Sequence, residues 1–436
     1  MLANNWKQNL HLEPTKGWLN DPNGLAYFNG KYHIFHQYSY EVNGGLKLWY
    51  YYTSSDLKNY EDRGVFLTPT IEEETHGVYS GSANIEDEKL VFYYTGNVKY
   101  KGDYDYVHAG RGHNTISFET EDGINFTEKK CLLKTDDYPN MSNHVRDPKI
   151  FEKNGKKYLV LGARDSNDYG CLLVYDKDTL EPFKTIYSKK NLGFMWECPD
   201  YFEVDGKEIF MFSPQGITRM YPNYENMYQI GYSIVEDGIE NVDKLDNFTL
   251  LDYGHDFYAS QTFLDEDNNR VLIGWMYVPD SSYTNPTTKF GYQNCLTVPR
   301  VVNFKDGKVR QTLHKSVKDL LGNDIETNDF NKNTWYYKQE HGESFEINVA
   351  DFKVSYENKE LKVSFGTSGY GRNDRKYKLD LEDVEIVFDS SSIELFANGG
   401  SFTISTRFYP ENHDVKILAT NYVAKELGAI EIREEN

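Results

Sequence analysis

The 436-residue sequence contains no long apolar run and few cysteines, and each shortage narrows the class of protein. No stretch approaches the roughly 20 consecutive apolar residues that a membrane-spanning helix requires, so we expect no association with a membrane. No group of histidine and carboxylate residues has the spacing of metal ligands, so neither a metal nor another cofactor is expected. The cysteines form no CxxC pair and give no sign of a disulfide framework or a zinc site; they are Cys131, Cys171, Cys198 and Cys295.

Positive charge is also scarce, because 47 Lys and Arg face 68 Asp and Glu, for a net charge of -21. Nucleic-acid binding depends on clustered basic residues that neutralise phosphates, so we exclude a nucleic-acid partner. Net charge describes the whole field and leaves room for one local basic pocket. The N-terminus lacks a basic segment followed by an apolar stretch, which predicts no secretory signal and a cytoplasmic location. The sequence carries no signal of the oligomeric state.

Tyrosine is abundant, with 36 residues, and most of the chain consists of short alternating or aromatic-rich runs that are typical of strands. Many of these runs flank an Asn-Gly or Asp-Gly turn, which is the strongest short-range signal of a β-hairpin. The clearest cases are YFNGKYHIF, FEKNGKKYLVL and FEVDGKEIFMF. The sequence therefore predicts an all-β protein.

Hairpin turns recur along the first three quarters of the chain, at steps of 58, 67, 51 and 62 residues. Units of roughly 40 to 60 residues that each hold a few antiparallel strands are the signature of a β-propeller. We therefore predict five blades, with turns near Asn29, Asp87, Asn154, Asp205 and Asp267.

A short polar motif precedes each of these turns by 7 or 8 residues. Equal offsets place the motifs at equivalent ends of equivalent strands, which in a propeller converge on one end of the central channel. Three carboxylates from three blades are therefore expected in one pocket. The aligned side chains are Asp21 in NDPNG, Ser80 in YSGSA, Asp147 in RDPK, Glu197 in ECPD and Ser260 in YASQ.

The pattern changes after about residue 320, where the motif and hairpin no longer recur and regular alternation begins, as in FEINVADFKVSYENKELKVSF. This change predicts a propeller over residues 1–325 and a C-terminal β-sandwich over residues 326–436.

Carboxylates in this arrangement suit glycoside hydrolysis. Retention of configuration needs two carboxyl groups about 5 to 5.5 Å apart, one that attacks the anomeric carbon and one that protonates the leaving oxygen. A short Asp held in a turn suits the nucleophile, and a longer Glu suits proton delivery. Each motif taken alone also has a purely structural interpretation, as a turn, a surface ion pair or a strand end.

Taken together, the motifs resemble those of glycoside hydrolase family 32, the family of invertases, fructan hydrolases and sucrose-6-phosphate hydrolases. The resemblance covers nearly the whole chain: WLNDPNG at 18–24, HQ at 36–37, SGSA at 80–83, RDP at 146–148, ECPD at 197–200, DFYASQTF at 256–263, GWM at 274–276, LTVPR at 296–300 and SSSIELFANGG at 390–400.

The resemblance implies a retaining enzyme that cleaves terminal β-fructofuranosyl bonds in a small carbohydrate through a covalent fructosyl intermediate. By this resemblance, Asp21 is expected to be the nucleophile, Glu197 the general acid/base and Asp147 the residue that stabilises the transition state. The family's substrate-binding positions correspond to Asn20, Gln37, Trp49, Ser80, Arg146 and Trp275.

One stretch departs from the family pattern. Family members commonly carry Glu-Trp-Gly and then Trp-Gly-His-Ala, whereas this chain has EVNGGLKLWYYYTSSDL, so that Tyr50, Tyr51 and Tyr52 stand at Gly-His-Ala. Either the strand has drifted neutrally or a wall on the leaving-group side has changed. Sucrose, sucrose 6-phosphate and short fructo-oligosaccharides all remain open as substrates. Basic residues that could approach the mouth of the site and read a phosphate are Arg219, Lys289 and Arg300.

Two other functions remain open at this point. An inverting pentosidase that resembles family 43 would use similar carboxylates across a wider gap. A propeller that binds carbohydrate without catalysis would use the same pocket. The combination of NDPNG with ECPD favours family 32, and the presence of all three carboxylates favours an enzyme.

Overall fold

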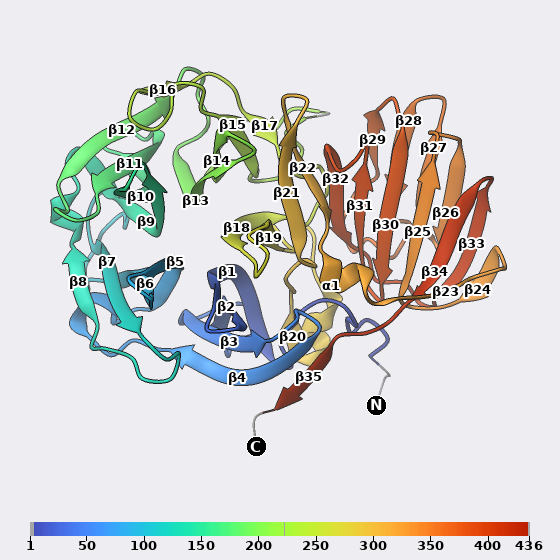
Figure 1. Cartoon of the computed structure of the whole chain (residues 1–436), viewed down its shortest axis with the longest axis horizontal. Coiled ribbons are helices and arrows are strands. Elements are labelled where there is room, and N and C mark those ends of the chain that lie inside the picture. Colours follow the sequence, from blue (N-terminus) through green and yellow to red (C-terminus); the bar gives the residue numbers. More distant parts are fainter. Residues whose placement is uncertain (1–3, 222, 435–436) are drawn as a thin grey trace.

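The computed structural model describes residues 4–221 and 223–434, and almost all of the regular structure in these ranges is strand (Figure 1). None of the described helices is long and apolar enough to cross a membrane. The predicted all-β fold, a propeller followed by a sandwich, is confirmed. The short helical elements are α1 (Lys315–Lys318) and the 3-10 turns η1 (Glu72–Glu74), η2 (Thr135–Asp137) and η3 (Pro286–Phe290).

The N-terminal part pairs into five separate sheets within the described residues. The first contains β1 (Gly17–Phe28), β2 (Lys31–Ser39), β3 (Leu48–Ser54) and β4 (Asn59–Leu67), with β20 (Tyr292–Gln293) beside β1 and β35 (Glu431–Glu434) beside β4. The second contains β5 (Val78–Glu86), β6 (Lys89–Lys99), β7 (Arg111–Thr120) and β8 (Lys130–Leu133).

The remaining three of these sheets follow the same order, with each first strand paired to the next along the chain. The third contains β9 (Met141–Lys153), β10 (Lys156–Asp165), β11 (Gly170–Asp176), β12 (Pro182–Ser188) and β16 (Lys244–Leu245). The fourth contains β13 (Met195–Val204), β14 (Lys207–Gln215), β15 (Gly231–Ile234) and β17 (Thr249–Leu250). The fifth contains β18 (Tyr258–Leu264), β19 (Arg270–Trp275), β21 (Arg300–Lys305) and β22 (Lys308–Leu313).

The first strands of these sheets stand around a common centre (Figure 1). In order, β1 contacts β5, β5 contacts β9, β9 contacts β13 and β13 contacts β18, which closes the ring on β1. Radial closure of this kind leaves few free sheet edges, which is the advantage of a propeller. Five sheets agree with five blades, although the number of blades stays a prediction.

The C-terminal part forms two six-stranded sheets in the described chain, whose inner faces share one large hydrophobic core. One contains β23 (Leu321–Asp324), β34 (Tyr422–Leu427), β25 (Trp335–Glu340), β30 (Asp383–Asp389), β31 (Ser392–Ala397) and β32 (Phe402–Arg407). The other contains β24 (Asp329–Asn331), β33 (Asp414–Ala419), β26 (Phe345–Val349), β27 (Phe352–Glu357), β28 (Glu360–Ser364) and β29 (Arg375–Lys378).

Two strands cross the predicted limit at residues 325 and 326. β23 precedes that limit but pairs with β34 of the sandwich, and β35 follows it but pairs in parallel with β4 of the propeller. Sheet pairing would therefore begin the sandwich a few residues earlier and return the last strand to the propeller. The domain limits themselves stay a prediction.

Fully buried ion pairs join the two parts. The Arg300 guanidinium donates to Glu394 from Nε at 2.8 Å and from Nη2 at 2.5 Å, and Arg372 donates to both oxygens of Asp256 at 2.8 Å. Removal of one partner from a buried pair leaves an uncompensated charge, which costs about 3–5 kcal/mol. These contacts hold the sandwich rigidly against the propeller.

Candidate active site

A β-bulge interrupts the first strand of each propeller sheet at the polar motif. The pairing register shifts between Leu19 and Pro22 in β1, and again at Tyr79–Gly81 in β5, Arg146–Lys149 in β9, Glu197–Asp200 in β13 and Tyr258–Gln261 in β18. A bulge bends its strand and re-aims a side chain. Asp147, Cys198 and Ala259 have φ of 60°, 47° and 50°, in the left-handed region that such an insertion uses. The matched offsets of the motifs therefore correspond to matched bulges.

These bulges bring the motifs together around a cavity of about 240 Å³. Ligand pockets commonly measure about 300–1,000 Å³, so this cavity suits a small ligand. All three predicted catalytic carboxylates line it. The lining side chains come from all five sheets and the loops beside them: Trp18, Asn20, Asp21, Gln37, Lys47, Tyr79, Ser80, Arg111, Arg146, Asp147, Glu197, Gln215, Tyr258, Trp275 and Pro279.

Asp21 is held by hydrogen bonds from both sides. The Ser80 hydroxyl donates to Oδ2 at 2.5 Å, and the Asn20 amide donates to Oδ1 at 3.2 Å. Burial raises the pKa of Asp21, the Ser80 hydrogen bond opposes that shift, and the charge of Glu197 adds to it. The Cys198 thiol lies 3.7 Å from Oδ2, and burial beside the carboxylates raises its pKa, so it remains a protonated donor. Asp21 is therefore fixed in one orientation toward the cavity.

Asp147 is tied to its neighbouring strands by backbone geometry. Its own N–H donates to Thr95 Oγ1 at 2.9 Å, and its Oδ2 accepts from the Cys198 N–H at 2.8 Å. Burial raises the pKa of Asp147 to about 7; the Arg146 charge lowers it, and the charges of Glu197 and Asp21 raise it. Asp147 is therefore held in one orientation, with Arg146 as the charge that favours its carboxylate form.

Glu197 accepts hydrogen bonds from three different sheets. Arg146 donates to Oε1 from Nε at 3.1 Å and from Nη2 at 2.7 Å. Gln215 Nε2 and the Tyr258 hydroxyl each donate to Oε2 at 2.8 Å. Arg146 is itself anchored, because its Nη1 donates to His144 Nδ1 at 2.7 Å. Arg146 therefore bridges the third and fourth sheets at the carboxylates.

Five of the six residues that were predicted to bind substrate line the cavity: Asn20, Gln37, Ser80, Arg146 and Trp275. Asn20 links three of its neighbours: its amide donates to Gln37 Oε1, and its Oδ1 accepts from the Trp18 indole at 2.9 Å and from Lys47 Nζ at 3.2 Å.

Trp49 is the exception. Its side chain is fully buried and packs edge-on against Phe92 and Tyr94 of the second sheet, at centroid distances of 6.5 and 5.9 Å. Its indole N–H donates to the Tyr79 carbonyl at 3.0 Å, so it supports a residue that lines the cavity. We therefore assign Trp49 a packing role, in place of the substrate contact that was predicted for it.

The atypical segment 41–52 contributes one side chain to the cavity, Lys47. Strand alternation turns Tyr50 and Tyr52 toward a separate cavity that they share with His36, while Tyr51 stacks on Phe35 at 4.1 Å. The three tyrosines thus do not form the wall on the leaving-group side that the sequence suggested.

None of the predicted phosphate-reading residues lines the cavity. Arg300 is paired in the interface between the two parts. Lys289 Nζ lies 4.2 Å from the centroid of the Trp6 ring, and Arg219 Nε donates to the Glu225 carbonyl at 3.1 Å. The cations that do line it, besides Arg146, are Lys47 and Arg111. Neither residue has a signal in the sequence, because Lys47 ends a loop, Arg111 follows one, and neither belongs to a motif.

Comparison with known proteins decides the family. The profile of the "Glycosyl hydrolases family 32 N-terminal domain" matches residues 11–314, and that of the "Glycosyl hydrolases family 32 C terminal" matches residues 321–433. The chain belongs to glycoside hydrolase family 32.

Members of family 32 resemble the chain over most of its length. A sucrose-6-phosphate hydrolase of Staphylococcus xylosus is 32% identical over 94% of this chain and 88% of its own. The structure of a sucrose-6-phosphate hydrolase of Lactobacillus gasseri is 28% identical, with a TM-score of 0.87 over 98% of this chain and 94% of its own. A variant of a Bombyx mori GH32 beta-fructofuranosidase in complex with sucrose is 26% identical, with a TM-score of 0.81 over 99% and 96%. The chain is therefore a glycoside hydrolase.

The hydrogen bond from Ser80 to Asp21 generates a first prediction. Hydrogen bonds to charged groups contribute about 1.5–3 kcal/mol, and one pKa unit corresponds to about 1.4 kcal/mol. Ser80→Ala should therefore raise the pKa of Asp21 and move the acidic limb of the pH profile of kcat/KM upward by about one unit.

Ser260→Ala is the matched control for this variant. Ser260 occupies the equivalent bulge, but its hydroxyl lies 3.5 Å from Met211 Sδ rather than beside a carboxylate. An unmoved acidic limb in Ser80→Ala, or equal shifts in both variants, would contradict the role given to Ser80.

Proposed function

We propose that Asp21 is the nucleophile, Glu197 the general acid/base and Asp147 the stabiliser of the transition state. The enzyme is a retaining hydrolase of β-fructofuranosyl bonds, as its family 32 relatives indicate. The convergence of the three carboxylates in one cavity supports these roles. The relatives give no support to an inverting pentosidase or to a binding propeller without catalysis.

In the proposed first step, Glu197 enters in its protonated form. The Asp21 carboxylate attacks C2 of the fructosyl unit, the bond from C2 to the leaving oxygen breaks, and Glu197 gives its proton to that oxygen. The carboxylate oxygens of Asp21 are held by Ser80, Asn20 and Cys198. Little orientational freedom of the carboxylate therefore remains to be lost in the transition state. In the second step Glu197 takes a proton from water, which attacks C2 and releases Asp21. Asp147 holds ring hydroxyls as positive charge develops at C2, so that it binds the transition state more tightly than the substrate.

We further propose that the leaving group carries a phosphate, as in sucrose 6-phosphate. Lys47 and Arg111 line the cavity, and neither forms an ion pair with a described carboxylate. Lys47 lies beside Asn20 and over Trp18, and Arg111 is electrostatically coupled to Arg146, the partner of Glu197. Two such cations at the site of a chain with a net charge of -21 favour an anionic substrate. A phosphorylated sugar is found inside cells, so this proposal carries with it the cytoplasmic location.

The nucleophile assignment is tested by fructose release from sucrose and from sucrose 6-phosphate. Asp21→Asn should lower kcat by at least about 1,000-fold on both substrates, because the covalent step then has no nucleophile. Asn29→Ala, in the turn that follows the same strand, should retain activity. Substantial residual turnover in Asp21→Asn would overturn the assignment.

The phosphate proposal is tested by the ratio of kcat/KM for sucrose 6-phosphate to that for sucrose. Removal of a charge-assisted contact costs about 1.5–3 kcal/mol, so Lys47→Met and Arg111→Met should each lower this ratio at least about tenfold. Lys289→Met and Arg219→Met remove the same charges outside the cavity and should leave the ratio unchanged.

The ratio should also depend on pH. Burial lowers the pKa of Lys47 to about 8, against the opposing charge of Asp21. Its positive charge is present below that value and is lost above it, so the preference for the phosphorylated substrate should fall as the pH rises through about 8.

A ratio near one in the wild type would contradict the phosphate proposal. It would not contradict the assignment of the protein as a fructosidase.

A further inference from the structure

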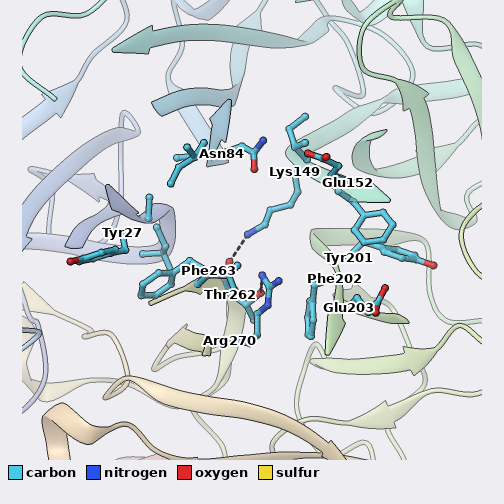
Figure 2. Close-up of a pocket in the computed structure, with 17 residues that line it drawn as sticks. Tyr27, Asn84, Lys149, Glu152, Tyr201, Phe202, Glu203, Thr262, Phe263 and Arg270 are labelled. Carbon is cyan, nitrogen blue, oxygen red and sulfur yellow. Dashed lines mark hydrogen bonds between the residues drawn. The ribbon is translucent and has the colours of Figure 1, made fainter. Parts of the chain in front are cut away.

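A second cavity of about 370 Å³ lies among the first strands of the propeller, beyond the bulges (Figure 2). Each of these strands contributes residues that follow its bulge, from Leu25–Tyr27 in β1 to Thr262–Leu264 in β18. It shares no lining residue with the catalytic cavity. The proposed reaction makes no use of it.

Two cationic side chains from different strands enter this cavity toward Thr262 (Figure 2). Lys149, the last residue of the RDPK motif, is 8% exposed, and its Nζ donates to the Thr262 carbonyl at 2.7 Å. Arg270 stands at the start of β19, with its guanidinium carbon 5.1 Å from the centroid of the Phe202 ring. Both cations thus line the same cavity.

Arg270 lacks the carboxylate partner that Arg300 and Arg372 have. Arg300 and Arg372 each bind a carboxylate through two N–H groups at 2.5–2.8 Å. The hydrogen bond of Arg270 runs from Nη1 to Thr262 Oγ1 at a long 3.5 Å, and its buried Nε has no partner among the described residues. A buried donor without an acceptor is costly, and an external acceptor would satisfy it.

The two cations also differ in their carboxylate partners. Asp200 Oδ2 lies 3.5 Å from Lys149 Nζ and also accepts from the Thr262 N–H. Lys149 therefore has a carboxylate partner, whereas Arg270 has none within ion-pair distance among the described residues. Glu152 and Glu203 line the cavity but are exposed, and neither forms an ion pair with Lys149 or Arg270 in the described chain. The Arg270 guanidinium is therefore left without a direct counter-ion in the described chain.

We propose that this cavity is a second binding site, specific for a phosphate group held between Arg270 and Lys149. The guanidinium supplies a planar fork of N–H donors and the ammonium a point charge, the combination that binds phosphate oxygens. The aromatic rings of Tyr27, Phe202 and Phe263 form apolar walls around the cations. The phosphate arrives either as the free ion or as the ester of a hexose, for which the cavity has room.

Isothermal titration calorimetry of the full chain with inorganic phosphate and with glucose 6-phosphate tests this site. The wild type should bind at least one of the two saturably, and glucose alone should give no heat at this site. Tighter binding of glucose 6-phosphate than of inorganic phosphate identifies the ester as the ligand, and the reverse order identifies the free ion. Either order supports the proposal.

Variants distinguish this cavity from the catalytic one. Arg270→Gln should weaken binding at least about tenfold, whereas Arg270→Lys, which keeps the charge, should weaken it less. Arg111→Met removes a cation from the catalytic cavity and should leave this binding event unchanged. The kcat/KM for sucrose should be the same in Arg270→Gln as in the wild type, which also shows that the variant is folded.

Two results would overturn the proposal. One is the absence of saturable binding of either phosphate ligand to the wild type at millimolar concentration. The other is equal affinity in the wild type, Arg270→Gln and Arg270→Lys.

Discussion

The ion pair between Arg146 and Glu197 is the contact on which the catalytic cavity depends. Three carboxyl groups in one buried cavity repel each other when ionised, and a positive charge beside them lowers that cost. Arg146 lies next to Asp147 in the chain and donates twice to Glu197 on the neighbouring sheet. A guanidinium suits this place because it keeps its charge when buried and offers several donors in a fixed plane. The same contact joins two blades of the propeller, so charge balance and geometry are fixed together.

The propeller makes this concentration of charge feasible because each carboxylate is carried by a different sheet. A bulge in each first strand turns one motif into the cavity, while the hairpin that follows packs into the hydrophobic core. The residues that follow each bulge face the other part of the channel, where Lys149 and Asp200 lie. The RDPK and ECPD motifs thus each contribute to both cavities. Their first residues, Arg146 and Glu197, line the catalytic cavity. Of their last residues, Lys149 lines the second cavity and Asp200 is its ion-pair partner.

The fold, and the place of three carboxylates in one cavity, could be predicted because their signals are local. A two-residue Asn-Gly turn fixes its own hairpin, and Asp21, Asp147 and Glu197 each precede such a turn by 7 or 8 residues, which is visible as a repeat in the sequence. Lys47 and Arg111 could not be found in this way, because their positions depend on the paths of loops and on contacts between distant sheets. Trp49 was misplaced for a different reason. Resemblance assigned it to the substrate, whereas the two-residue period of β3 turns it into the core with Tyr51.

The covalent intermediate proposed on Asp21 gives the most direct test of these roles. It can be measured by quenching the wild-type enzyme in acid during turnover of sucrose or sucrose 6-phosphate, digesting it with pepsin and analysing the peptides by mass spectrometry. The peptide that contains Asp21 should be heavier by one fructosyl unit, and fragmentation should place the added mass on the Asp21 side chain. The added mass on Asp147 or Glu197 instead, or a complete absence of labelled peptide at saturating concentrations of both substrates, would contradict the assignment of the nucleophile.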